Sequence, residues 1–193
     1  GGSPNHDVID YINIASLGNG TDFGDLTASK SNSGSVSNGT RIVVAGGQKH
    51  VPGPNPHINE IEYFIAASLG NASDFGDLPT ARHGTRGCSD GTKGVISGGY
   101  ASGNDVQDEM EYFNIASVGN ATDFGNLSAA KGYLGATDNG TVGRGVIMSG
   151  SAGQAGPEEQ VIDYITIASL GNSADFGDLL SGTKSQGCCA SGD

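Results

Sequence analysis

Pairs of acidic residues are the groups in this sequence whose type and spacing could do chemistry, because clustered carboxylate oxygens are ligands that Ca²⁺ takes in proteins. They recur within D-F-G segments, as Asp22/Asp25, Asp74/Asp77 and Asp175/Asp178, with Asn126 in place of the second acid in a further copy. No EF-hand or nonapeptide calcium pattern surrounds them, and a kinase-type D-F-G metal site would also need a glycine-rich loop and a catalytic loop. We therefore predict that these acids hydrogen bond to turns. Ca²⁺ binding is the alternative, and no other cofactor is expected.

Histidine and serine offer weaker chemistry. His6, His50 and His57 fall in expected loops, where three histidines could take a metal if they met across neighbouring units. They do not recur in register, so solvated loop residues are the expectation. No serine has the matching histidine and acid that a G-x-S-x-G nucleophile needs, and the three cysteines form no C-x-x-C pair. We predict no catalytic residue, no metal site and no enzymatic activity.

The composition excludes several other classes of protein. The 193 residues include 34 glycines, and 21 acidic residues against 9 basic ones give a net charge of −12. A nucleic-acid binder needs a basic stripe, so no nucleic-acid partner is predicted. No apolar run approaches the roughly 18 residues of a membrane span, and the glycines lack the three-residue period of collagen. The sequence is typical of a glycine-rich, all-β protein with many turns.

The elements that would position these side chains come from a repeat. Segments 9–26, 61–78, 110–127 and 162–179 are copies of one another, with 9 of 18 positions identical in all four. Their phenylalanines are separated by 52, 49 and 52 residues, which gives a period of about 51. A short apolar strand recurs between them, at 41–47, 94–99 and 145–150. Small residues precede that strand at 84–90 and 132–137, and residues 187–189 hold the same place in the last copy.

Each unit therefore reads as four short strands. The small-residue segment is the first strand, the apolar segment is the second, and each 18-residue copy supplies the third and fourth. A Gly-Asn pair between the last two strands favours a tight hairpin, because both residues accept positive φ. The third strand carries apolar residues on both faces, as in a sheet packed between two similar sheets. Four-stranded units of about 50 residues are typical of β-propeller blades.

Three further features recur at fixed places in each unit. Small-residue doublets close the second strand at Gly1-Gly2, Gly46-Gly47, Gly98-Gly99 and Ser149-Gly150. Aromatic residues follow in the third strand at Tyr11, Tyr63, Tyr112 and Tyr164, and in the fourth at Phe23, Phe75, Phe124 and Phe176. A basic residue comes after the fourth strand at Lys30, Arg82, Lys131 and Lys184. In these features the chain resembles the kelch family, which often has Arg at the last position. The resemblance implies kelch-like β-propeller blades, with the aromatic residues as structural anchors.

The sequence of the fourth copy, IDYITIAS followed by DFGDL, looks like kelch-like repeats of marine bacteriophage virion proteins. That resemblance implies a tail, tail-fibre or other structural protein of a virion or extracellular surface. The implied partners are other virion or surface subunits, including further copies in a homo-oligomer, and host glycans, with no membrane insertion. The alternative is a secreted carbohydrate-binding, lectin-like propeller.

The loops that follow the doublets differ most between copies, at 3–8, 48–60, 100–109 and 151–161. A rigid repeat that carries variable loops on one face is a common binding scaffold. We predict that His50, His57, Tyr100 and Asn104 contact a ligand. The alternative for each of them is an ordinary solvent-exposed loop residue.

The number of strands predicts how the units close. Third and fourth strands occur four times, but complete second strands only three times. We therefore expect residues 1–193 to form a single repeat domain that is part of a larger propeller or repeat array. Closure would come from further sequence or from another subunit, and an array that did not close would resemble a fibre. A four-bladed propeller lacking one strand is the alternative.

Overall fold

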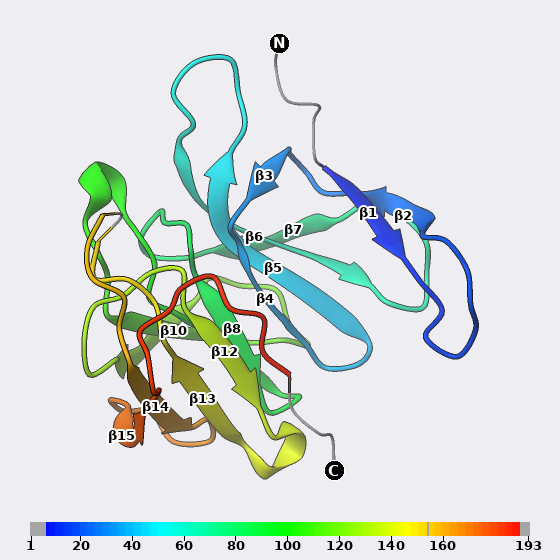
Figure 1. Cartoon of the computed structure of the whole chain (residues 1–193). Helices are drawn as coiled ribbons and strands as arrows, with labels where there is room; N and C mark the ends of the chain where they lie inside the picture. The colour runs from blue at the N-terminus through cyan, green and yellow to red at the C-terminus, as the bar shows by residue number, and fades with distance from the viewer. Residues whose placement is uncertain (1–6, 154, 190–193) are drawn as a thin grey trace.

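The computed structural model describes residues 7–153 and 155–189 (Figure 1). They form an all-β protein in which four antiparallel sheets follow one another along the chain. The first sheet is β1 (Val8–Tyr11) and β2 (Thr21–Asp25). The second is β3 (Lys30–Ser31), β4 (Gly34–Ser37), β5 (Arg41–Lys49), β6 (His57–Ile65) and β7 (Ser73–Asp77). The third is β8 (Arg86–Ser89), β9 (Lys93–Ser97), β10 (Glu109–Asn114) and β11 (Thr122–Asn126). The fourth is β12 (Gly135–Asp138), β13 (Arg144–Met148), β14 (Val161–Thr166) and β15 (Ala174–Asp178).

The predicted strand order is confirmed in the second, third and fourth sheets. In each, the small-residue strand pairs with the apolar strand, which pairs with the two strands of an 18-residue copy. Two three-residue 3₁₀ turns, Ser102–Asn104 and Gly140–Val142, interrupt the loops. Within the described ranges, no helix is long and apolar enough to cross a membrane. The prediction of a strand at 187–189 is wrong, since this segment makes no ladder although Cys188 packs beside Gly135.

The D-F-G segments are bulges within the fourth strands, whereas their acids were predicted to hydrogen bond to turns. In the second sheet Ile61 pairs with Gly76 and Glu62 pairs with Asp74, so Phe75 opposes no residue. The same shift occurs in the first, third and fourth sheets. A bulge bends its strand and redirects a side chain. Here it coincides with a phenylalanine that packs on the next sheet.

The core lies between the sheets. One cluster joins the second and third sheets and includes Val43, Ile61, Phe75, Phe113 and Ile115. The other joins the third and fourth sheets and includes Val95, Met110, Phe124, Ile147 and Ile165. Each sheet thus buries its apolar residues only against its sequence neighbours, as in a repeat protein.

The small-residue strands line an inner axis. Strand β8 lies against both β4 and β12 (Figure 1). Residues 185–188 complete a hollow of about 410 Å³ with Ser35, Arg86 and Ala136. A Cβ atom on Gly87 would lie 2.6 Å from Ser35 O, so a side chain there would displace the neighbouring backbone. Part of the glycine content therefore serves close packing of strands at the axis. The arrangement is consistent with a propeller-like all-β fold.

Candidate functional site

The D-F-G segments hold the Gly-Asn hairpin of the next sheet, an interaction that we call the Gly-Asn contact. Gly70 N donates to Phe23 O at 2.8 Å, Gly119 N to Phe75 O at 2.7 Å, and Gly171 N to Phe124 O at 2.8 Å. Asn71 Oδ1 accepts from Asp25 N, Asn120 Oδ1 from Asp77 N, and Asn172 Oδ1 from Asn126 N, each at 3.0 Å. The second acid of each predicted pair therefore contributes its backbone N–H, which explains why asparagine serves equally at position 126. Among the described residues, no group of three or more His, Cys, Asp and Glu side chains is placed to hold a metal ion.

The Gly-Asn contact predicts a glycine requirement that depends on position. A Cβ atom on Gly76 would lie 2.5 Å from Gly119 O, whereas the equivalent Gly177 has nothing within 4 Å. Both have positive φ, at 148° and 138°, so the backbone strain of an alanine is shared. We expect Gly76→Ala to lower the free energy of unfolding by about 1–3 kcal/mol more than Gly177→Ala, because only the former displaces a packed backbone. Urea unfolding of the two variants measures the difference, and equal losses would show that the contact has no role in the effect.

Buried ion pairs join the same neighbouring sheets. Lys30 pairs with Glu62, Arg82 with Glu111, and Lys131 with Asp163. Lys131 Nζ lies 2.6 Å from Asp163 Oδ2, and both side chains are 0% exposed. Burial lowers the pKa of Arg82 to about 10, although the negative charge of Glu109 raises it. The guanidinium therefore remains charged at neutral pH. The repeated basic position is thus structural. Sequence reasoning missed its acidic partners, although an acid stands at the second position of every copy.

The loops that follow two of the doublets border an open pocket, which we call the cavity. It has a volume of about 360 Å³ and is lined by Asn55, Pro56, His57, Ala81, Ser102 and Gly103. In Figure 1 the β5–β6 loop and the 3₁₀ turn Ser102–Asn104 project at the upper left of the molecule. An amide, an imidazole and a hydroxyl therefore border a small apolar surface. This set can hydrogen bond to a polar ligand while packing against its carbon atoms.

Packed rings lie beside His57. The His57 ring is 4.3 Å from that of His83, which lies 5.6 Å from the rings of both Tyr100 and Tyr133. His83 Nε2 is 3.1 Å from Tyr133 Oη, and Tyr100 Oη donates to Ser151 O at 3.0 Å. Burial, followed by the charge of His57, lowers the pKa of His83, although a backbone hydrogen bond at Tyr100 opposes this. His83 is therefore neutral at pH 7 and supports His57 as a packed aromatic group.

The predicted ligand contacts have different positions in the structure. His57 lines the cavity, whereas His50 is half-buried, with Nε2 2.9 Å from Ser31 Oγ. Tyr100 is 0% exposed, so the prediction that it contacts a ligand is wrong, because its ring packs beneath the loops. The Asn104 side chain and all of His6 lie outside the described residues. Sequence reasoning missed His83 and Tyr133, since neither recurs in the repeat.

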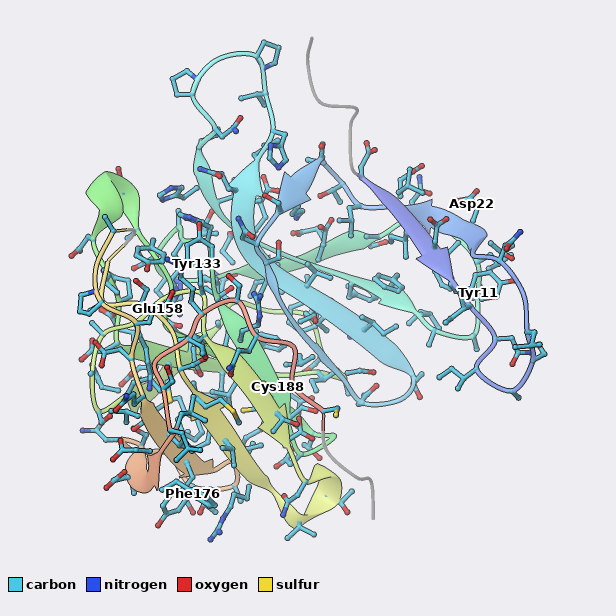
Figure 2. The ribbon with its side chains drawn as sticks, viewed as in Figure 1. Tyr11, Asp22, Tyr133, Glu158, Phe176 and Cys188 are labelled. Atoms are coloured by element: carbon cyan, nitrogen blue, oxygen red, sulfur yellow. The ribbon has the colours of Figure 1, made fainter. Side chains whose placement is uncertain are left out.

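The predicted anchors pair within every sheet but are not equally buried. The Tyr–Phe ring distances are 6.1 Å for Tyr11–Phe23, 5.9 Å for Tyr63–Phe75, 6.1 Å for Tyr112–Phe124 and 6.1 Å for Tyr164–Phe176. The first three phenylalanines are 7%, 2% and 2% exposed because each is covered by the next sheet. Phe176 is 54% exposed and Tyr11 is 43% exposed, and both are labelled in Figure 2. Among residues 7–153 and 155–189, the first and last sheets therefore each present an uncovered face.

Comparisons with known proteins inform the fold. No family model matches the chain, and no curated protein matches it in sequence. The solved structure of YjhT is similar, with a TM-score of 0.71 at 11% identity over 86% of this chain. The matched part spans 58% of the YjhT chain. At this identity the likeness concerns the all-β fold alone.

Proposed function

We propose that this chain is a non-enzymatic structural and binding module of a virion or other extracellular surface, built from kelch-like propeller blades. The observation that carries the proposal is the difference in role between repeated positions and variable loops. Positions that recur in all copies serve contacts between sheets, as in the Gly-Asn contact and the buried ion pairs. The cavity, in contrast, is lined chiefly by loops that differ between copies. A repeated scaffold with individual loops suits recognition of a host surface or a neighbouring subunit.

Host glycan is the ligand class that we propose for the cavity. Asn55, His57 and Ser102 offer side-chain donors and acceptors for sugar hydroxyl groups, and Pro56 and Ala81 offer apolar surface for the C–H face of a sugar ring. The same observation supports the alternative function, a secreted lectin-like propeller. The two differ in setting: the first places the chain in an assembly of subunits, and the second leaves it to act alone.

Glycan-array binding with His57→Ala tests this proposal. We expect the parent chain to bind a set of glycans and His57→Ala to weaken that binding about tenfold or more, since a hydrogen bond to the ligand and the wall of the cavity are lost. His50→Ala is the matched control, because it removes a histidine of the same loop that does not itself line the cavity, although its Nδ1 lies 3.5 Å from Asn55 Nδ2. Thermal unfolding shows whether each variant remains folded. No glycan binding by the parent chain, or equal losses in the two variants, would contradict the proposed ligand.

A further inference from the structure

We propose that copies of this chain associate head to tail, with the fourth sheet of one copy docked against the first sheet of the next. Three contacts join successive sheets inside the chain, and the two uncovered sheets carry the complementary halves of all three. This inference depends on the repeat contacts alone and is independent of glycan binding. Its occupant is a second copy of the chain because the missing partner at each end is present at the other.

The first complementary part is the Gly-Asn contact. Inside the chain, the hairpin that carries Gly171 and Asn172 docks on the bulged strand β11. On β15, the equivalent Gly177 has nothing within 4 Å of the place where a Cβ would stand. In the first sheet, the equivalent hairpin carries Gly18, and neighbouring Leu17 is fully exposed. The last sheet thus presents the docking strand and the first sheet presents the hairpin.

The second part is apolar. The Phe23 ring lies 5.2 Å from that of Phe64, and the Phe75 ring lies 5.1 Å from that of Phe113, across successive sheets. Phe176 holds the equivalent place on the last sheet, and Ile12 is the first-sheet equivalent of Phe64 and Phe113. Ile12 is 65% exposed and Ile14 is 95% exposed, whereas Ile115 and Ile167, the third- and fourth-sheet counterparts of Ile14, are both 0% exposed. Exposed apolar residues whose counterparts in the third and fourth sheets are buried mark an interface.

The third part is electrostatic. Each buried ion pair links a base after the outer strand of one sheet to an acid on the third strand of the next. Lys184 is the last base of the series, and its side chain is 40% exposed, with Glu158 at 3.7 Å. Asp10 is the first acid of the series and is exposed. A lysine at one end therefore complements a carboxylate at the other, in the arrangement that Lys131 and Asp163 have inside the chain.

The two halves lie on different sides of one molecule. In Figure 2, Tyr11 marks the first sheet at the right and Phe176 marks the last sheet at the lower left. Within one copy the two halves therefore do not meet, and a second copy can supply the partner of each. Such a contact joins unlike surfaces, so it extends as a chain of copies or closes as a ring.

Sedimentation equilibrium of the 193-residue chain, from low to several hundred micromolar, tests the association. We expect dimers or larger species that increase with concentration. Lys184→Glu and Asp10→Lys should each weaken association at least about thirtyfold, because each places like charges at a contact that becomes buried. An equimolar mixture of the two variants should form a heterodimer, because their altered ends carry opposite charges. Phe176→Ala should also weaken association while leaving a folded monomer, since the ring is half-exposed there.

Matched controls separate this interface from general charge effects. Lys49→Glu changes a lysine on the second sheet. Its Nζ lies 3.7 Å from Glu60, the same distance that separates Lys184 from Glu158. Asp22→Lys introduces the same charge change as Asp10→Lys, also on the first sheet. Its position lies outside the proposed contact, because the counterparts Asp74 and Asp123 are exposed. Both controls should associate like the parent chain. A parent chain that stays monomeric throughout, or controls that weaken association as much as the end variants, would overturn the proposal.

Discussion

Phe75→Ala should lower the free energy of unfolding by about 3–5 kcal/mol, as expected for loss of a fully packed aromatic ring from a core. Phe75 is 2% exposed and lies on a bulge that directs it between the second and third sheets. Its ring is 5.9 Å from that of Tyr63 and 5.1 Å from that of Phe113. Removing the ring leaves a cavity between the second and third sheets. Chemical unfolding followed by far-UV circular dichroism measures the loss.

Phe176→Ala is the matched control for that measurement. The two phenylalanines occupy the same place in the repeat and pair with equivalent tyrosines, but Phe176 is 54% exposed. At concentrations where the chain is monomeric, we expect its replacement to cost less than about 1 kcal/mol. A loss for Phe75→Ala as small as that would mean that Phe75 is not covered by the third sheet.

Lys131→Met should be similarly destabilising, by about 3–5 kcal/mol, because it leaves a buried carboxylate without its partner. The Asp163 side chain is 0% exposed, and besides Lys131 it accepts a hydrogen bond from Ser173 Oγ at 2.8 Å. Replacing both charges, with Lys131→Met and Asp163→Leu together, should recover most of the loss, since two apolar groups need no compensation. A double variant as unstable as Lys131→Met would show that the packing of the lysine stem, and not the stranded charge, causes the loss.

The same pair predicts a pH dependence. Burial alone would raise the pKa of Asp163, but hydrogen bonds from Lys131 and serine hydroxyls, with the lysine charge, lower it below the usual value of 3.8. In the parent chain the group therefore contributes stability above about pH 4, and this contribution is lost as the pH falls through 3.8 toward the folded pKa. In Lys131→Met, burial raises the pKa of Asp163. Asp163 in this variant therefore becomes protonated, and loses its unpaired buried charge, at a higher pH than in the parent chain. The stability gap between the two proteins should narrow from pH 7 to pH 4, and a constant gap in urea unfolding would contradict the assignment.

The sequence predicted the sheets well because strand signals are local. The short apolar segments, the Gly-Asn hairpins and the recurring doublets each act over a few residues, and they located the third and fourth strands of all four copies. Contacts between sheets were harder to predict because their partners lie far apart. Asp25 and Asn71 are 46 residues apart, and Arg82 and Glu111 are 29 apart. The D-F-G bulge was missed for a related reason, since a register shift is defined only by the opposite strand.

The candidate site was predicted in part. Loop variability indicated a surface that carries a cavity, and His57 lines that cavity. Loop variability could not show that Tyr100, on a similar loop, turns inward and donates a hydrogen bond to Ser151 O. That contact depends on how two sheets meet, as does the packing of His83 and Tyr133. Residues outside the repeat carry no periodic signal, so their positions come only from the assembled fold.

The uniform Gly-Asn contact also has a genetic consequence. Because each sheet holds the next through the same atoms, recombination between two copies can delete or add a whole unit of about 51 residues without creating a new kind of junction. Loss of residues 61–109, for example, would place Glu111 opposite Lys30 in place of Glu62, and the hairpin at Gly119 beside Phe23 in place of that at Gly70. A gene of this design can change the length of its product by unequal crossing-over. The loops of each unit can then diverge separately, so the surface evolves while the scaffold stays the same.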